Sequence, residues 1–348
     1  MGRIRVALSS DFRKADGTPT FPSFDLAPLM DDPDIEIVWA DAVDGEIPAA
    51  ALEGCHGLIL LVPKLTARSI PASDTLAVVA RFGVGYDNVD VAACTEAGIA
   101  CVITPAGVRR PVAVSVITYV LTLSQNLLIK DRLTRQGPPG WARRAEHMGV
   151  GLVGKTLGQL GIGNIGAEVF RMAAPFGFRF IAHDPYADPA LAAELGVELV
   201  SLEDLFRRSD FLSVSVPLNE ETRGIVNAER LRLMKPTAYV INTARGPIVD
   251  QRAIYEALTT GVIAGAGLDV FENEPESADE PLFRLDNVIV TPHALCWTDE
   301  CFAGIGSADV AAMKALMQGR VPDGVVDRAV LETDRFRRRL AAFSQGGG

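Results

Sequence analysis

Short apolar runs recur along the whole chain and are separated by segments in which apolar and polar positions mix at helical spacing. The runs have the length and composition of strands that are buried on both faces. They predict strands at residues 4–8, 36–39, 57–62, 76–84, 99–103, 157–160, 178–182, 211–216, 238–242, 263–269 and 288–291. Strands that alternate with helices predict an α/β fold with parallel sheets.

The segments between the runs predict helices. Helices are expected at residues 92–98, 111–130 and 167–174, after Ser201 and after Asn227, around residues 254–258, and at residues 307–317. Pro111 is expected to begin the long helix because proline suits a first turn. Residues 136–141 are rich in glycine and proline, which predicts a loop.

A glycine-rich turn lies at the centre of this pattern. Gly161, Gly163 and Gly166 follow an apolar run at G-x-G-x-x-G spacing and precede a predicted helix. The first glycine allows a tight turn, the second lets a pyrophosphate approach the backbone, and the third lets helix and strand pack closely. The N-terminus of the helix offers N–H groups to phosphates. The turn alone is weak evidence, because glycine-rich turns are common.

An acidic residue strengthens the prediction of a dinucleotide site. Asp184 follows the next apolar run, close to the position where a carboxylate binds the hydroxyls of the adenosine ribose. The same carboxylate would repel the extra phosphate of NADP, so NAD is the expected cofactor.

Length and charge narrow the class of protein. The chain has 348 residues, for which two domains are the natural expectation, and a net charge of -11, which argues against a nucleic-acid partner. The five cysteines form no C-x-x-C pair, which favours a reducing cytoplasm over a disulfide framework. No uninterrupted apolar run is long enough to span a membrane, the N-terminal apolar part is too short for a signal peptide, and no metal site is expected.

Three stretches past the ends of predicted strands bring together a cation, a carboxylate and an imidazole. These are residues 241–246 with Arg245, residues 268–275 with Asp269 and Glu274, and residues 290–293 with His293. Ligands of open α/β sheets bind at this edge. Each of these residues taken alone is more often an ordinary surface or loop residue, so their common order along the chain carries the interpretation.

With these stretches, the chain closely resembles the D-isomer-specific 2-hydroxyacid dehydrogenases from about Leu60 to Thr298. Further matches are residues 83–90, residues 153–157 before the glycine turn, residues 216–218 and residues 222–224. The resemblance implies two Rossmann-like or flavodoxin-like parallel-sheet domains. The NAD-binding domain, residues 108–296, would be inserted into a discontinuous substrate domain, residues 1–107 and 297–348. It also implies a homodimer and a small anionic 2-oxo or 2-hydroxy acid as substrate.

The resemblance also implies roles for individual residues. Arg245 would bind the carboxylate and carbonyl of the substrate, His293 would exchange a proton with the carbonyl oxygen, and Glu274 would orient His293 and favour its charged form. Asp269 would orient the nicotinamide, and the backbone near Val84 and Gly85 would hold the substrate carboxylate. The expected NAD contacts are Gly161, Gly163, Asn164, Ile165, Gly166, Asp184, Val216, Pro217, Thr222, Thr243, Ala244, Arg245, Asp269 and His293.

Departures from the family pattern leave the substrate open. Residues 111–114 read Pro-Val-Ala-Val where many relatives have Ser-Val-Ala-Glu. Lys64 stands on the early substrate loop, either as a contact for an anionic substrate or as a solvated side chain. Trp297 follows His293 in a bulky run and either lines the substrate pocket or belongs to a core. His56, His147 and His183 match no motif and are expected to be structural.

Two other functions remain possible on the same scaffold. One is a phosphite-type dehydrogenase, and the other is a dinucleotide-sensing corepressor that binds partner proteins. A formate dehydrogenase is disfavoured because it would carry glutamine at the position of Glu274. The basic run at residues 335–339 is expected to be a solvated face without a function of its own.

Overall fold

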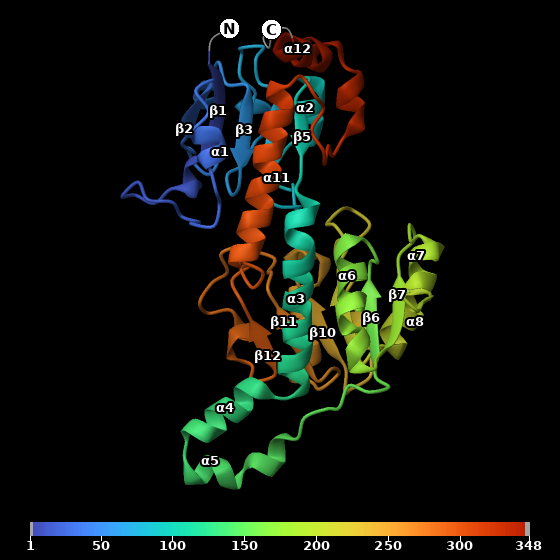
Figure 1. Ribbon diagram of the computed structural model, residues 1–348. Coiled ribbons are helices and arrows are strands. Elements are labelled where there is room, and N and C mark those ends of the chain that lie inside the picture. The colour runs from blue at the N-terminus through green and yellow to red at the C-terminus, as the bar shows by residue number, and fades with distance from the viewer. Residues whose placement is uncertain (1–2, 345–348) are drawn as a thin grey trace. The chain divides into compact units, whose positions relative to one another are not determined.

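The computed structural model describes residues 3–344, and its chain divides into two compact units (Figure 1). Unit 1 contains the residues up to Val108 and those from Trp297 onward, and unit 2 contains Arg109–Cys296. The chain therefore leaves unit 1 once and returns to it once. Each unit is built around its own parallel sheet.

The sheet of unit 1 has five strands in the order β2-β1-β3-β4-β5. Its strands are β1 (Ile4–Ser9), β2 (Ile35–Ala40), β3 (Gly57–Leu60), β4 (Val78–Arg81) and β5 (Ala100–Val102). Its helices are α1 (Ala27–Met30), α2 (Val91–Glu96), α11 (Asp299–Met317) and α12 (Asp334–Ser344). This is the flavodoxin-like strand order. The burial of β3 on every residue explains why it reads as a continuous apolar run.

The sheet of unit 2 has seven strands in the order β12-β11-β10-β9-β6-β7-β8, all paired in parallel. They are β6 (Thr156–Leu160), β7 (Arg179–His183), β8 (Val197–Leu199), β9 (Phe211–Val214), β10 (Tyr239–Asn242), β11 (Gly265–Leu268) and β12 (Val288–Val290). The six strands from β8 to β11 have the Rossmann order, and the order reverses between β6 and β9. The predicted α/β class with Rossmann-like and flavodoxin-like sheets is confirmed.

The helices of unit 2 are α3 (Pro105–Ser124, which begins in unit 1), α4 (Leu127–Arg135), α5 (Pro138–Ala142), α6 (Asn164–Ala173), α7 (Pro189–Glu194), α8 (Leu202–Arg208), α9 (Ala228–Leu231) and α10 (Gln251–Thr259). Local caps fix several of their starts. The hydroxyl of Ser201 accepts the N–H of Asp204 at 3.1 Å, and the Asn227 side chain accepts the N–H of Arg230 at 3.0 Å.

Two expected boundaries around the long helix are wrong. The helix begins at Pro105, and Pro111 lies inside it, because both prolines suit a first turn and the earlier one takes that position. It ends at Ser124 because Asn126 adopts a left-handed conformation with φ 51°, which separates α3 from α4. Residues 138–142, expected as a loop, form α5, since two prolines occupy its first turn.

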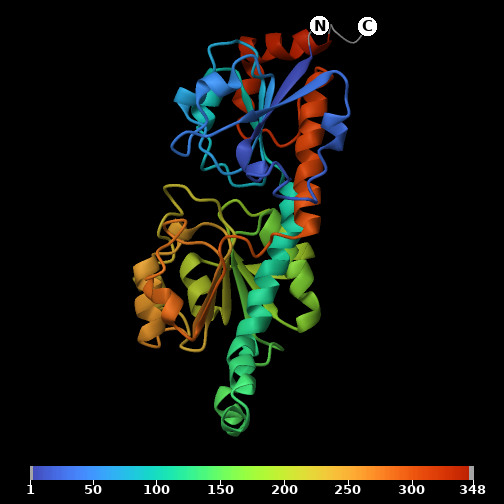
Figure 2. The same ribbon diagram turned by 90° about the vertical axis from the view of Figure 1, so that its left-hand side faces the viewer.

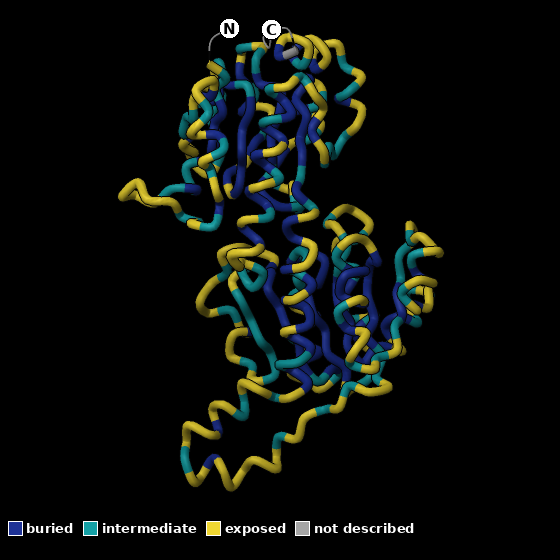
Figure 3. Tube along the Cα trace, viewed as in Figure 1, coloured by how far each residue is buried: buried dark blue, intermediate teal, exposed yellow. Residues whose placement is uncertain are grey.

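Helices α4 and α5 form an arm that projects from the sheet of unit 2, as the two perpendicular views show (Figures 1 and 2). Gly140 lies so close to α4 that a Cβ there would be 1.8 Å from the carbonyl oxygen of Leu133. The outside of the arm is mostly exposed, in contrast to the buried strands of the sheet (Figure 3).

Apolar side chains fill both faces of the seven-stranded sheet. Leu212, Val240 and Ile254 belong to the cluster on one face, and Val116, Val169 and Phe211 belong to a second cluster. Helix α3 is the one helix in residues 3–344 with the length and composition of a membrane span, but 61% of its apolar window is buried inside the protein. Core helices of soluble proteins also have this length and composition, so these properties are weak evidence for a membrane span.

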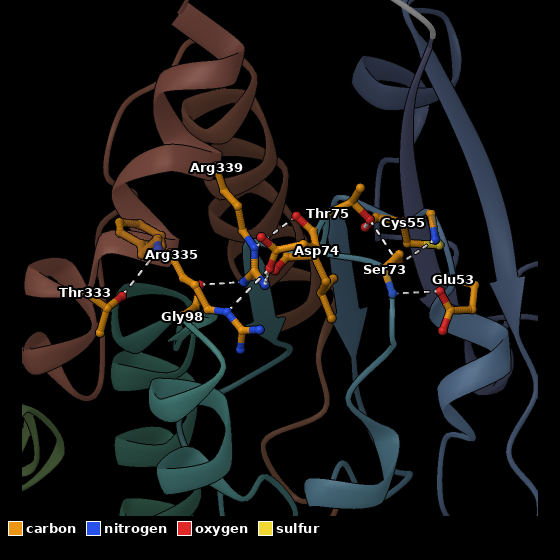
Figure 4. A network of polar contacts seen from close by, with 12 residues as sticks. Glu53, Cys55, Ser73, Asp74, Thr75, Gly98, Thr333, Arg335 and Arg339 are labelled. Carbon is orange, nitrogen blue, oxygen red and sulfur yellow. Dashed lines mark hydrogen bonds and ion pairs between the residues drawn. The ribbon is translucent and has the colours of Figure 1, made fainter.

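The basic run at residues 335–339 is not entirely a solvated face, which corrects the expectation. Arg339 is buried and donates to the carbonyl oxygens of Asp74 at 3.2 Å and of Leu76 and Gly98 at 2.7 Å each. Its guanidinium also pairs with the Asp74 carboxylate at 2.5 Å (Figure 4). The pKa of Asp74 is lowered by this hydrogen bond and by the nearby positive charges. Arg339 thereby fastens α12 to the segments that lead into β4 and β5.

Candidate functional site

The candidate residues of unit 2 follow six strands of its sheet. Gly161–Gly166 follow β6, Asp184 follows β7, Val216, Pro217 and Thr222 follow β9, Thr243–Arg245 follow β10, Asp269 follows β11, and His293 follows β12. Because all seven strands run in parallel, these residues lie along one edge of the sheet. The reversal of strand order between β6 and β9 marks the point on that edge where ligands of such sheets bind.

The three glycines of the turn have three different surroundings. Gly161 has φ +93°, and a Cβ there would be 2.7 Å from the carbonyl oxygen of Ser215. A Cβ on Gly166 would be 2.3 Å from the carbonyl oxygen of Gly161, so helix α6 packs directly on the turn. A Cβ on Gly163 would meet nothing within 4 Å, and Gly163 precedes the first residue of α6 without a side-chain cap. The turn therefore leaves open space at a helix N-terminus, which fits a pyrophosphate.

Asp184 connects the second strand of the nucleotide fold to the glycine turn. Its carboxylate accepts the N–H of Ile162 at 3.0 Å and the N–H of Tyr186 at 2.9 Å, one on each oxygen. The side chain is only half-buried. Since each carboxylate oxygen can accept more than one hydrogen bond, Asp184 is held in place and can still accept ribose hydroxyls.

The loop that carries Arg245 is organised by a buried asparagine. The Asn242 side chain accepts the N–H of Ala244 at 3.0 Å and donates to the carbonyl oxygen of Arg245 at 2.9 Å. A Cβ on Gly246 would be 1.8 Å from the carbonyl oxygen of Phe271. The loops after β10 and β11 are therefore in direct backbone contact, which brings Arg245 and Glu274 into one neighbourhood.

Glu274 and His293 form a hydrogen-bonded pair. The Oε2 atom of Glu274 lies 2.6 Å from Nδ1 of His293, and Oε1 accepts the N–H of Phe271 at 2.9 Å. Burial raises the pKa of Glu274, but the hydrogen bonds from His293 and Phe271 and the charges of His293 and Arg245 together lower it below its ordinary value. Both side chains remain partly exposed, at 42% for His293 and 36% for Glu274, so a ligand can reach the pair.

Asp269 ties the turn after β12 to the end of β11. Its Oδ1 atom accepts the hydroxyl of Thr291 at 2.5 Å and the N–H groups of Ala294 and Leu295 at 3.1 and 3.2 Å. Its carbonyl oxygen accepts the N–H of His293 at 2.7 Å. The turn that carries His293 is thereby fixed at four points on one residue.

The candidate residues of unit 1 lie on two loops that an asparagine joins. The Asn88 side chain donates to the carbonyl oxygens of Leu61 at 3.0 Å and Pro63 at 2.9 Å. The backbone N–H of Leu65 donates to the carbonyl oxygen of Asn88 at 2.8 Å. The loop with Lys64 is therefore in contact with the loop that carries Val84 and Gly85, and the Lys64 side chain is exposed.

Trp297 belongs to an aromatic cluster of unit 1. Its ring meets those of Phe21 and Phe302 edge-on at centroid distances of 5.5 and 5.4 Å, and Phe21 stacks on Phe302 at 4.3 Å. Trp297 is still 49% exposed. It therefore lies at the margin of the cluster, with one part of the ring packed and another part accessible.

Comparisons with known proteins agree with this geometry. Residues 117–294 match the model of the D-isomer specific 2-hydroxyacid dehydrogenase NAD binding domain, which places the match inside unit 2. The chain is 39% identical over 286 residues to the glyoxylate reductase of Korarchaeum cryptofilum (strain OPF8), which covers 81% of this chain and 85% of that relative. The chain belongs to the D-isomer specific 2-hydroxyacid dehydrogenase family. It is thus an NAD-binding oxidoreductase that acts on a CH–OH donor.

Two further members of the family show its range. The D-3-phosphoglycerate dehydrogenase of Mycobacterium tuberculosis (strain ATCC 25618 / H37Rv) is 38% identical over 293 residues, which are 84% of this chain and 55% of that relative. The chain therefore spans about half the length of that protein. The D-lactate dehydrogenase from Aquifex aeolicus, solved with NAD and lactic acid, superposes with a TM-score of 0.76 at 30% identity over 90% of this chain and 96% of that chain.

These dehydrogenases and reductases leave the corepressor and the phosphite dehydrogenase without support. Within residues 3–344, no group of three or more histidine, cysteine, aspartate or glutamate side chains could hold a metal ion. Four residues that hold the loops in place were not predicted as functional from the sequence: Asn242, Asn88, Thr291 and Tyr119. The role of Asn242 could have been found from the Asn-x-x-Arg spacing of residues 242–245, because an asparagine side chain commonly forms hydrogen bonds with backbone groups two or three residues away.

Proposed function

We propose that the chain is an NAD-dependent dehydrogenase that interconverts a small D-2-hydroxy acid and its 2-oxo acid. The observation that carries the proposal is the Glu274–His293 pair with Arg245 in the same unit, along the same sheet edge as a glycine turn with open space for a pyrophosphate. NAD, when bound, supplies or accepts the hydride. In this proposal unit 2 binds NAD, and unit 1 provides the substrate loops.

The hydrogen bond to Glu274 decides which atom of His293 serves the reaction. A carboxylate can only accept, so the proton between the two residues resides on Nδ1. The remaining nitrogen, Nε2, carries a proton when the ring is charged and a lone pair when the ring is neutral. Nε2 can therefore donate a proton to the carbonyl oxygen during reduction and accept the hydroxyl proton during oxidation.

Arg245 would fix the substrate for this proton transfer. Its forked guanidinium can bind the carboxylate and the carbonyl of a 2-oxo acid together, which aims the carbonyl carbon at the nicotinamide. The N–H groups near Val84 and Gly85 would bind the carboxylate, with Lys64 and Trp297 as further substrate contacts. The expected NAD contacts are the turn residues Gly161–Gly166 and the strand-end residues described above.

We propose NAD over NADP because of Asp184. Its half-buried carboxylate is held by two backbone N–H groups and is directed toward the end of the nucleotide strands. A ribose with two hydroxyls can donate to this carboxylate, whereas a 2′-phosphate would be repelled by it.

We further propose a homodimer formed through the arm of unit 2. Trp141, Met148 and Val153 are 57, 76 and 85% exposed, and Leu127 and Leu128 are also exposed. Leu127, Leu128 and Trp141 belong to the arm, and Met148 and Val153 to the segment that follows it. A second copy of this region would cover these large apolar side chains. The parent chain should sediment as a dimer at micromolar concentration, and Leu128→Asp should shift it toward the monomer. A monomeric parent would contradict this proposal.

We propose a reducing compartment, the cytoplasm, because the five cysteines form no C-x-x-C pair and fit no disulfide framework. Burial raises the pKa of the Cys94 and Cys101 thiols to about 12 each. Such thiols are poor nucleophiles and suit a structural role in a core.

Oxidation of NADH with a panel of 2-oxo acids, beginning with glyoxylate and pyruvate, tests the function. His293→Ala should lower kcat by about a hundredfold or more while NADH binding is retained. His147→Ala, at a histidine that follows α5 and has no role in the proposed site, is the matched control and should have parent activity. If His293→Ala reduces the best 2-oxo acid as fast as the parent, the proton donor is another residue.

A further inference from the structure

Tyr119 on helix α3 is a fully buried side chain for which the proposed reaction has no use. Its ring packs on the backbone of β11, where a Cβ on Gly267 would be 2.5 Å from its Cδ1 atom. Its hydroxyl lies 2.5 Å from Oγ1 of Thr291, which follows β12. Burial raises the pKa of Tyr119 far above its ordinary value, so the hydroxyl keeps its proton.

The direction of this hydrogen-bond chain follows from its last member. The Thr291 hydroxyl donates its single proton to Oδ1 of Asp269. Thr291 then has no proton left for Tyr119, and Tyr119 must donate to Thr291. The chain therefore runs from Tyr119 through Thr291 to Asp269, and each hydroxyl has one orientation.

Asp269 connects this hydrogen-bond chain to the turn that carries His293. Its Oδ1 atom holds the N–H groups of Ala294 and Leu295, and its carbonyl oxygen holds the N–H of His293. His293 has φ +52°, a left-handed conformation that is unfavourable for a residue with a Cβ. Such a conformation persists only where the surroundings hold it.

We propose that Tyr119 is a positioning residue for His293 and acts through Thr291 and Asp269. The inference rests on the proposed role of His293. Helix α3 thereby fixes the backbone conformation from which the His293 ring reaches Glu274, although Tyr119 itself touches neither His293 nor Glu274. Removal of the Tyr119 hydroxyl takes away the donor that orients the Thr291 hydroxyl and thereby loosens Asp269 beneath the turn.

Three substitutions test this hydrogen-bond chain. Tyr119→Phe keeps the ring on Gly267 and removes only the hydroxyl; we expect kcat to fall about three- to tenfold, as for the loss of one neutral hydrogen bond. Thr291→Val removes both bonds of the Thr291 hydroxyl, to Tyr119 and to the Asp269 carboxylate, and should lower kcat about ten- to a hundredfold. Thr291→Ser restores a hydroxyl and should recover most of the activity.

Tyr239→Phe is the matched control. Tyr239 is also a buried tyrosine of this unit, and its ring stacks on Phe211 at 5.1 Å. This variant should keep the parent kcat. In Tyr119→Phe, the Kd for NADH should stay within twofold of the parent, and the primary isotope effect with deuterated NADH should rise because hydride and proton transfer become slower. A loss of NADH binding equal to the loss of kcat would overturn the inference, as would a parent-like kcat.

Hydrogen exchange of the backbone amides tests, without an activity assay, whether the chain from Tyr119 to Asp269 holds the turn of His293; this hold is called the clamp below. The amides of residues 293–295 should exchange about three- to tenfold faster in Tyr119→Phe, the range expected for one hydrogen bond, while those of β10 should not change. Equal exchange in parent and variant would overturn the inference. If the parent reduces no 2-oxo acid but the exchange of residues 293–295 still depends on Tyr119, the proposed function fails and the clamp stands.

Discussion

A single methyl group added at Gly163 separates cofactor binding from folding. Gly163 has an ordinary φ of -66°, and the new Cβ would meet nothing within 4 Å. The free energy of unfolding of Gly163→Ala should therefore stay within about 1 kcal/mol of the parent, since effects of this kind on helix caps and backbone entropy are small. The methyl group would occupy the space proposed for the pyrophosphate.

The expected loss of NADH affinity follows from the hydrogen bonds at the helix N-terminus. Displacement of the pyrophosphate weakens one charge-assisted hydrogen bond or more, each of which contributes about 1.5–3 kcal/mol. The Kd for NADH should rise about 10- to 100-fold, which corresponds to about 1.4–2.8 kcal/mol.

Gly166→Ala is the matched substitution in the same turn. Its Cβ would be 2.3 Å from the carbonyl oxygen of Gly161, a distance that real Cβ atoms essentially never show. Helix α6 must therefore move away from the turn, and we expect the free energy of unfolding to fall by about 1–3 kcal/mol, as for an overpacked core.

Urea unfolding of the NAD-free proteins measures the free energy of unfolding. Titration with NADH, followed by its fluorescence, measures the Kd for NADH. Parent-like NADH affinity in Gly163→Ala would refute the assignment of the open space to the pyrophosphate. If Gly163→Ala lowered the free energy of unfolding as much as Gly166→Ala, the space around Gly163 would not be open, and this reasoning would be refuted.

Four further substitutions test other parts of the chain. The pKa of Glu274 is lowered from its ordinary value of 4.5, so above that pH the side chain is an ionised partner for His293, and the stability that this ionised form contributes is lost only as the pH falls through the lowered value. In Glu274→Gln the pH above which reduction declines should move downward, and an unchanged pH–rate profile would contradict this. Asp184→Ala should narrow the preference for NAD in binding titrations, whereas equal or tighter binding of NADP by the parent would contradict the cofactor assignment. Gly246→Ala would place a Cβ 1.8 Å from the carbonyl oxygen of Phe271 and should lower kcat/KM about a hundredfold by displacing the catalytic loops; parent-like kinetics would be the contrary result. Arg339→Met should lower the free energy of unfolding by about 2–4 kcal/mol in urea, because three carbonyl oxygens lose a charged donor, and a loss below about 1 kcal/mol would contradict the importance of this contact.

Strand positions were the most predictable feature of the fold because strands buried on both faces read as apolar runs. The predicted run at residues 238–242 differs from β10 by one residue, and all four residues of β10 are buried. Helix boundaries were less predictable around proline. Pro105 and Pro111 have the same local preference, and only the course of the whole helix shows which of them lies in its first turn.

The order of the reactive residues could be predicted from strand ends, but the contacts that hold them could not. Glu274 and His293 are 19 residues apart, and a family resemblance was enough to pair them. Tyr119 and Thr291 are 172 residues apart, and no local pattern connects a helix interior with a turn beyond the last strand. Arg339 is a similar case, since its partners lie in segments more than two hundred residues earlier.

The division of the chain into units also sets the order in which the protein can fold during synthesis. All of unit 2 lies in the consecutive residues Arg109–Cys296, so its sheet is complete when the ribosome has made them. The strands β1–β5 emerge first, yet they must wait for α11 and α12, the last helices of the chain. Until Arg339 arrives, the carbonyl oxygens of Leu76 and Gly98 lack their donor. The N-terminal part of unit 1, which is synthesised first, is therefore exposed to proteases and chaperones for the longest time.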